Sequence, residues 1–220
     1  VLANCLNTTD GPFYIGKDTL VMEGTLIRGP VVIGQNSLVK MGTKIYGGTS
    51  IGNYSKAGGE IGKSLIYDFA NKGHEGFVGN SVIGEWCNVG ADSNTSNLKN
   101  NYDEVKLWNY TKESFVRTGE QFLGLIMGDH SKCGINTMFN TGTVVGICAN
   151  IYGADYQPNF IASFSWGGKG NLKTYQINKA FETIVAVMQR RKLDLSDADR
   201  EILLHIFNLT EGYRKITKAV

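Results

Sequence analysis

The stretch IGKDTLVMEGTLIRGPVVIGQNSLVKMGTKIYGGTSIG, residues 15–52, decides how this chain folds. An aliphatic side chain returns in it at every sixth position: Ile15, Val21, Ile27, Ile33, Val39, Ile45 and Ile51. Four positions after each comes a small or β-branched residue, from Thr19 to Ser55. Because a helix repeats at about 3.6 residues and a strand at about 2, a period of six predicts short strands joined by tight corners. Three such units make one triangular coil.

This hexapeptide signature resembles that of the left-handed parallel β-helix. In that fold the aliphatic residue fills the interior of a prism, and the small residue lies near a corner. The resemblance implies coils stacked roughly 4.8 Å apart and hydrogen-bonded to one another along the column. We therefore expect an all-β main domain built as a left-handed parallel β-helix.

The repeat is interrupted twice. The first interruption runs from Ala57 to Gly76, where we expect a bulge out of the prism that carries His74. The repeat then resumes as Phe77, Ile83 and Val89. The second interruption, residues 98–122, alternates polar and apolar side chains and predicts a protruding β-ribbon loop. The ladder returns afterwards at Met127, Cys133, Phe139, Val145 and Ile151.

The pattern changes to a helical one near the end of the chain. Residues 178–191 carry apolar side chains at helical spacing. Ser196 with Asp199 three positions later is typical of a helix N-cap and opens a second amphipathic helix. We therefore divide the chain into a β-helix domain, residues 1–160, and a C-terminal helical extension, residues 161–220.

Composition narrows the classes of function. A net charge of +2 is small for a nucleic-acid surface, and no apolar run or leader predicts a membrane protein. The expectation is a cytoplasmic protein without nucleic-acid or membrane partners. The four cysteines form no CxxC pair and favour reduced, buried thiols. The chain opens at Val1 and enters the repeat directly, so we expect the fold to begin further upstream.

Two stretches resemble known families. KGHEGFVGNSVIGEWCNVGADSNTSN, residues 72–97, resembles the acetyltransferase half of the bifunctional glucosamine-1-phosphate N-acetyltransferase and N-acetylglucosamine-1-phosphate uridylyltransferase family. GDHSKCGINTMFNTGTVVG, residues 128–146, is similar to the C-terminal half of sugar-nucleotidyltransferase-like proteins labelled glucose-1-phosphate thymidylyltransferase. The resemblance implies an acetyl-CoA-dependent N-acetyltransferase that acts on an amino-sugar 1-phosphate such as glucosamine-1-phosphate.

The resemblance also implies catalytic residues. His74 occupies the position of the family's general base, which takes a proton from the sugar amine. An imidazole with an unperturbed pKa of about 6.5 can accept that proton near neutral pH, and base catalysis contributes about 10² to 10⁴ in rate. Asn97 matches the asparagine that touches the acceptor sugar beside the reacting amine.

Acceptor and cofactor positions follow from the same resemblance. Glu60 matches an acceptor-binding glutamate, and Lys44 stands where the family has a phosphate-binding arginine. Lys99 and Lys106, on the ribbon, either add charge for the phosphate or for coenzyme A, or form a solvated face. For acetyl-CoA the family uses main-chain groups between subunits of a homotrimer, and the matching positions are Ala91, Ile135 and Gly153.

Two departures from the family leave a second function open. Phe77 replaces a tyrosine near the acceptor, and Asp92 places a carboxylate near the thioester. Both favour a non-enzymatic reading, in which the column is a trimerising or regulatory module of a sugar-1-phosphate nucleotidylyltransferase. A third reading is a zinc carbonic anhydrase, which shares the fold, but His74 and His130 lack the spacing of its three-histidine site. No tightly bound metal is expected.

Overall fold

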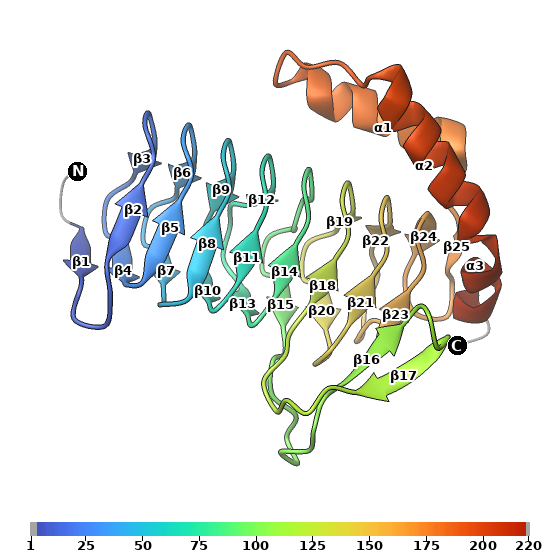
Figure 1. Cartoon of the computed structure of the whole chain (residues 1–220), viewed down its shortest axis with the longest axis horizontal. Coiled ribbons are helices and arrows are strands. Elements are labelled where there is room, and N and C mark those ends of the chain that lie inside the picture. The colour runs from blue at the N-terminus through green and yellow to red at the C-terminus, as the bar shows by residue number, and fades with distance from the viewer. Residues whose placement is uncertain (1–3, 219–220) are drawn as a thin grey trace.

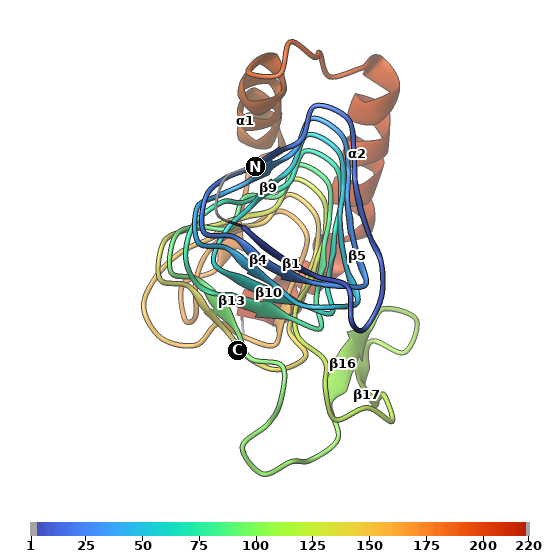
Figure 2. The same ribbon diagram turned by 90° about the vertical axis from the view of Figure 1, so that its left-hand side faces the viewer.

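The structure is a computed structural model and describes residues 4–218. Short parallel strands stack along its length into a column with three faces (Figure 1). A view along the column shows the coils as nested triangles, with a hairpin and the helices outside them (Figure 2). The fold is a left-handed parallel β-helix, which confirms the prediction from the six-residue repeat.

Each face collects one strand from each coil, and we name the faces A, B and C. Face A contains β1 (Cys5–Asn7), β4 (Leu26–Arg28), β7 (Lys44–Ile45), β10 (Glu60–Gly62), β13 (Phe77–Gly79), β15 (Asn94–Thr95) and β20 (Met138–Phe139). Face B contains β2 (Phe13–Ile15), β5 (Val31–Ile33), β8 (Thr49–Ile51), β11 (Leu65–Ile66), β14 (Val82–Ile83), β18 (Ile126–Met127), β21 (Val144–Val145) and β23 (Phe160–Ile161). Face C contains β3 (Leu20–Val21), β6 (Leu38–Val39), β9 (Lys56–Ala57), β12 (Asn71–Lys72), β19 (Lys132–Cys133), β22 (Asn150–Ile151) and β24 (Ser165–Gly167), and the antiparallel β25 (Lys173–Thr174) extends it.

Aliphatic side chains of the repeat fill the interior. Ile33, Ile45 and Ile51 are buried in one continuous core that runs along the column. The small residues at the corners are buried as well, and their hydroxyls donate to nearby carbonyls: Ser55 Oγ donates to Tyr67 O at 2.8 Å. A buried hydroxyl with a partner avoids the free-energy cost of an unpaired polar group, which explains why Ser and Thr suit this position.

The prediction of a bulge between Ala57 and Gly76 is wrong, because the column continues through this stretch. Ile45 pairs with Ile61, sixteen positions on, and Ile61 pairs with Val78, seventeen positions on. The first coils have eighteen residues. The corner at Gly58 and Gly59 shortens the coil from Ile45 to Ile61, and the coil from Ile61 to Val78 loses one residue at the corner between Ile61 and Ile66. The shortened corners hide the six-residue period in the sequence, but the strands stay paired from coil to coil.

A further short corner corrects the place of Phe77, because Ile83 follows the interior Val78 after five positions instead of six. The sequence predicted that Phe77 would continue the interior ladder, but the fully buried side chain is that of its neighbour Val78. Phe77 alternates with Val78 along the strand and therefore faces outward, half-buried, on face A. This moves Phe77 from the core to the surface where the acceptor residues were expected.

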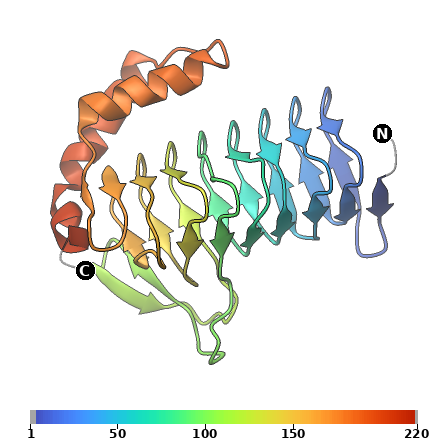
Figure 3. The ribbon, with the colours of Figure 1, turned by 180° about the vertical axis from the view of Figure 1, so that it is seen from behind.

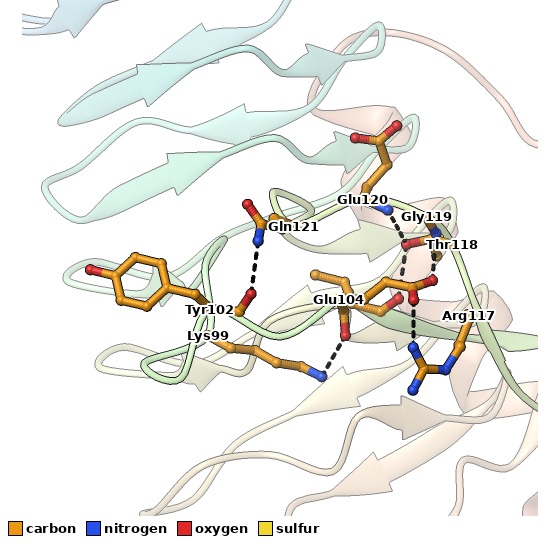
Figure 4. Close-up of polar contacts among 9 residues, drawn as sticks. Lys99, Tyr102, Glu104, Arg117, Thr118, Gly119, Glu120 and Gln121 are labelled. Atoms are coloured by element: carbon orange, nitrogen blue, oxygen red, sulfur yellow. Dashed lines mark hydrogen bonds and ion pairs between the residues drawn. The ribbon is translucent and has the colours of Figure 1, made fainter.

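The predicted β-ribbon is confirmed as β16 (Lys106–Asn109) paired antiparallel with β17 (Ser114–Arg117). It leaves the column between faces A and B and extends towards the C-terminal coils (Figure 1). At its base, Glu104 accepts hydrogen bonds from Arg117 Nη1 at 2.7 Å and from the amide of Gly119 at 2.6 Å (Figure 4). The Trp108 ring stacks on Phe160 with the centroids 4.2 Å apart, which holds the ribbon against the column.

The two predicted helices are α1 (Ile177–Gln189) and α2 (Asp197–Leu209), and a third, α3 (Glu211–Lys218), follows them. The N-cap is confirmed, since Ser196 Oγ accepts from the amide of Asp199 at 3.1 Å. Helix α1 runs back along the column above its upper corner, and α2 returns towards the C-terminal end (Figures 1 and 3). The helices pack against the corner between faces B and C in a second hydrophobic core, which includes Trp86, Ile184 and Met188. The division into two domains stays a prediction.

Two further expectations concern composition. All four cysteines are free thiols, and Cys87, Cys133 and Cys148 are buried, whereas Cys5 is exposed. Within residues 4–218, none of the helices combines the length and the apolar character that crossing a bilayer requires.

Candidate active site

Lys44, Glu60 and Phe77 lie side by side on the outer surface of face A. The strands pair Lys44 with Glu60 and Glu60 with Phe77, so that the three side chains occupy successive coils. Lys44 Nζ approaches Glu60 Oε2 to 3.8 Å, and both side chains are more than a third exposed. The structure therefore brings together on one surface the three residues that were predicted from the sequence to bind the acceptor.

His74 lies on the corner between faces C and A, beside this surface. It is exposed, and the backbone beneath it packs against the preceding coil very closely. A Cβ at Gly58 would lie 2.6 Å from the carbonyl carbon of Gly73 and 2.9 Å from the amide nitrogen of His74. Only glycine permits that approach, so Gly58 fixes how far His74 stands from the coil above.

Asn97 meets Phe77 at the far edge of face A. A Cβ at Gly79 would touch both the Phe77 ring, at 2.4 Å, and Asn97 Nδ2, at 2.9 Å, so the absence of a side chain at Gly79 makes room for both groups. Asn97 Nδ2 donates to Asn80 Oδ1 at 2.8 Å, which orients the amide. Asn97 and His74 thus lie on opposite edges of the same face.

The three positions expected to contact acetyl-CoA follow His74 along its own corner. Ala91 O accepts from the amide of Asn136 at 2.8 Å, which stacks the corner at Ala91 on the corner at Ile135. The register of β19 with β22 places Gly153 one coil beyond Ile135. Both residues are exposed. One edge of the column therefore presents an imidazole followed by the corners at Ala91, Ile135 and Gly153.

Lys99 and Lys106 lie apart from that edge. Lys99 Nζ donates to Glu104 O at 2.9 Å within the base of the ribbon (Figure 4). Lys106 is exposed at the start of β16 and pairs with Arg117 across the ribbon. Since the ribbon leaves the column between faces A and B, neither lysine shares the corner of His74 within one chain.

Lys72 was missed by sequence reasoning and is the most unusual residue near His74. It is fully buried, and it fills an interior position of the prism that the repeat gives to an aliphatic side chain. Its ammonium group donates to three main-chain oxygens: Gly58 O at 3.2 Å, His74 O at 2.5 Å and Glu75 O at 3.1 Å. Burial lowers the pKa of Lys72 to about 8.

The position of Lys72 in the repeat explains why it is buried and why it was missed in the sequence. It comes six residues after Ile66 and six before Val78, so the interior spacing itself marks it. That signal was hidden because Phe77 was taken as the interior residue. The three hydrogen bonds tie the corner that carries His74 to the coil above it, through Gly58.

His130 lies on a different corner, between faces B and C. Its ring continues a stack of aromatic rings contributed by Tyr54, Phe69 and Trp86, with ring centroids 4.1 to 6.2 Å apart. Burial, followed by the nearby Lys132, lowers the pKa of His130 to about 4. Because His74 and His130 occupy different corners, they do not converge on one ion within a chain. Across residues 4–218, no group of three or more His, Cys, Asp or Glu side chains is arranged to hold a metal.

Comparison with known proteins adds relatives for part of the chain. No family model matches it. It is 34% identical over 93 residues to a bifunctional sugar-1-phosphate nucleotidylyltransferase/acetyltransferase of Sulfurisphaera tokodaii, a match that covers 42% of this chain and 23% of that protein. It is 37% identical over 87 residues to the bifunctional protein GlmU of Methanocaldococcus jannaschii, covering 40% of this chain and 21% of that protein.

Solved structures support the fold. The polySia-specific acetyltransferase NeuO superposes with a TM-score of 0.54 at 12% identity, over 78% of this chain and 86% of that one. The matches to the curated relatives span less than a quarter of their length. The chain is thus a hexapeptide-repeat β-helix whose matched two fifths fit the C-terminal acetyltransferase half of the bifunctional sugar-1-phosphate nucleotidylyltransferase and acetyltransferase proteins.

Proposed function

We propose that the protein is an acetyl-CoA-dependent N-acetyltransferase of an amino-sugar 1-phosphate such as glucosamine-1-phosphate. The observation that carries this proposal is the corner of His74. An exposed imidazole stands there between face A, with Lys44 and Glu60, and a row of backbone groups that continues past Ala91 along the same edge. An acceptor can lie on the face while a thioester lies along the edge.

The proposed reaction needs one proton acceptor. His74 takes a proton from the amine of the sugar as the nitrogen attacks the carbonyl carbon of the thioester. The new C–N bond forms, the C–S bond breaks, and the proton held by the imidazole passes to the departing thiolate of coenzyme A. Lys44 neutralises part of the phosphate charge as a point charge, and Glu60 accepts hydrogen bonds from sugar hydroxyls.

Two residues would shape the specificity of this site. Phe77 offers a ring without a hydroxyl where the acceptor would lie, and Asn97 offers an amide at the far edge of the same face. The main-chain groups at Ala91, Ile135 and Gly153 would line the path of the pantetheine chain. In the proposed homotrimer, a neighbouring chain closes the groove along this edge and excludes water from the thioester.

Direct detection of product tests the proposal. Purified protein is incubated with acetyl-CoA and glucosamine-1-phosphate, and the sugar phosphate is analysed by mass spectrometry. We expect N-acetylglucosamine-1-phosphate together with an equal amount of free coenzyme A. Recovery of both substrates unchanged, at protein concentrations well above those of a catalyst, would reject the proposed reaction.

The second candidate is a trimerising or regulatory module of a sugar-1-phosphate nucleotidylyltransferase. Phe77 and the carboxylate of Asp92, exposed on the corner after Ala91, favour it. The two functions differ in their ligands. Saturable binding of acetyl-CoA that inorganic pyrophosphate does not displace supports the transferase, and its absence supports the module.

A further inference from the structure

A column of polar side chains lies on face C, next to the corner of His74 but on a different surface from Lys44, Glu60 and Phe77. Lys56, Asn71, Asn88 and Lys132 occupy four successive coils, because each is paired with the next in the parallel ladder. Their sequence neighbours Ala57 and Cys133 point into the core, so the polar side chains point outward. With coils about 4.8 Å apart, this column spans roughly 14 Å.

The end of helix α1 covers this column. Arg190 and Arg191 follow α1 directly, where the helix reaches furthest back over the strands (Figure 3). Arg191 Nη2 donates to Tyr54 O at 3.2 Å and so ties the helix to the corner between faces B and C. Between strands and helix lies a cavity of about 440 Å³, and the rings of Phe69 and Trp86 form one of its walls.

The charges around this cavity are of one sign. Lys56, Lys132, Arg190 and Arg191 line it, and no carboxylate does. Within residues 4–218, none of these four side chains forms an ion pair. The overall chain, by contrast, is nearly balanced, with 22 basic and 20 acidic residues. The cations are therefore concentrated here instead of being interleaved with acids.

Two of these cations are also partly withdrawn from water. Lys132 Nζ donates to His130 O at 2.9 Å, and burial lowers the pKa of Lys132. The pKa of Lys56 is lowered first by burial and then by the nearby Arg191, Lys40 and Arg190. Like charges held together at low solvent exposure cost free energy, which a bound anion would recover.

We propose that this basic pocket, formed by Lys56, Asn71, Asn88, Lys132, Arg190 and Arg191, binds a ligand that carries a diphosphate group. Guanidinium groups grip phosphate oxygens with two parallel hydrogen bonds, and ammonium groups act as point charges. Asn71 Nδ2 donates to Asn88 Oδ1 at 2.7 Å. The amide nitrogen of the Asn88 side chain can then donate to a ligand oxygen that lies between the two lysines. A column of roughly 14 Å is too long for a single phosphate but suits a diphosphate with its attached groups.

Ligands that carry such a group include nucleoside diphosphates and coenzyme A. The pocket lies on face C and beneath α1, whereas His74 lies on the corner with face A. Binding there does not use His74, so it can be tested separately from the proposed acetyl transfer. A protein that fails to acetylate sugars can still bind the diphosphate, and the two proposals can fail separately.

Calorimetric titration of the full chain with inorganic pyrophosphate tests the pocket. We expect one saturable site per chain, weakening as the salt concentration rises. The double variant Arg190→Gln, Arg191→Gln should bind at least tenfold more weakly, and so should Lys132→Gln. The matched control Lys17→Gln, Lys63→Gln removes two exposed lysines from corners outside the pocket and should bind as the wild type does.

Circular dichroism first establishes that each variant is folded, and the arginine pair lies at the end of α1, where it fills no core position. Competition with uridine diphosphate and with coenzyme A then identifies the source, since the one that displaces pyrophosphate is the ligand class. Three results would overturn the proposal: no saturable binding, equal binding by the arginine variant, or displacement by neither competitor.

Discussion

Lys72 shows at the scale of one residue how this column departs from its own repeat. An aliphatic side chain in its place would satisfy the core, yet the chain buries an ammonium group that meets only main-chain oxygens. The desolvation cost is visible in its lowered pKa, about 8 against 10.5 for an exposed lysine. What the lysine provides in return is a fixed corner beneath His74.

We predict that comparison with the variant Lys72→Met reveals how the buried ammonium group makes the stability of the protein depend on pH. Between pH 8 and 10.5 the unfolded chain binds a proton that the folded chain does not, so the free energy of unfolding contributed by Lys72 rises with pH across this window. The wild type should gain about 3 kcal/mol relative to Lys72→Met over the window. Denaturant unfolding at each pH measures the difference. A constant difference would mean that the folded chain keeps the proton of Lys72 throughout this window, so that burial does not lower its pKa.

The ring stack between faces B and C couples stability to acid in a similar way. Because the pKa of His130 is lowered from 6.5 to about 4, the unfolded chain binds a proton first as the pH falls. His130 therefore contributes stability that is present above pH 6.5 and is lost as the pH falls to 4, by about 3 kcal/mol. The variant His130→Phe keeps the stack on Trp86 and should lose less stability over this range. His205→Ala, an exposed position on α2, should behave as the wild type.

At the scale of elements, the contracted corner at Gly58 and Gly59 shapes the site. It shortens the coil from eighteen to sixteen residues and lets the backbone of Gly73 approach within van der Waals distance. Any side chain at Gly58 would force the corner of His74 away from its neighbour.

Gly58→Ala is therefore expected to destabilise the protein by about 2 kcal/mol or more, as overpacking in a close-packed interior does. Hydrogen exchange should show faster exchange in the peptide that contains His74, because its corner is displaced. Gly212→Ala in α3 is the matched control, since a Cβ there has nothing within 4 Å. Equal stability of the two variants would show that the close approach is not a constraint.

Some elements could be predicted from the sequence and others could not, in each case for a physical reason. The uninterrupted hexads of residues 15–52 gave the fold because each coil repeats its spacing, and the ribbon and the first two helices carried clear patterns. The coil at Gly58 was misread because a shortened corner changes the spacing from six to four. Helix α3 was missed because its eight residues are mostly polar. Lys72 was missed because a charged residue is not expected inside a prism.

At the scale of the whole molecule, the candidate site is open. His74, Ile135 and Gly153 are all exposed in the single chain, although a thioester needs to be shielded from water. A sequence cannot supply the groups that a second copy would bring to this edge. The proposed homotrimer does so, and sedimentation should give a mass three times the 24.1 kDa of one chain. A purely monomeric protein with full activity would contradict a site shared between chains.

The rate of acetyl transfer in the His74→Ala variant tests the central claim most directly. Release of coenzyme A from acetyl-CoA is measured with glucosamine-1-phosphate present and absent, for the wild type, for His74→Ala and for His205→Ala. The account predicts release that requires the sugar phosphate and falls at least a hundredfold in His74→Ala, as expected for loss of a general base, while His205→Ala keeps the wild-type rate. Equal rates in the wild type and in His74→Ala would contradict it.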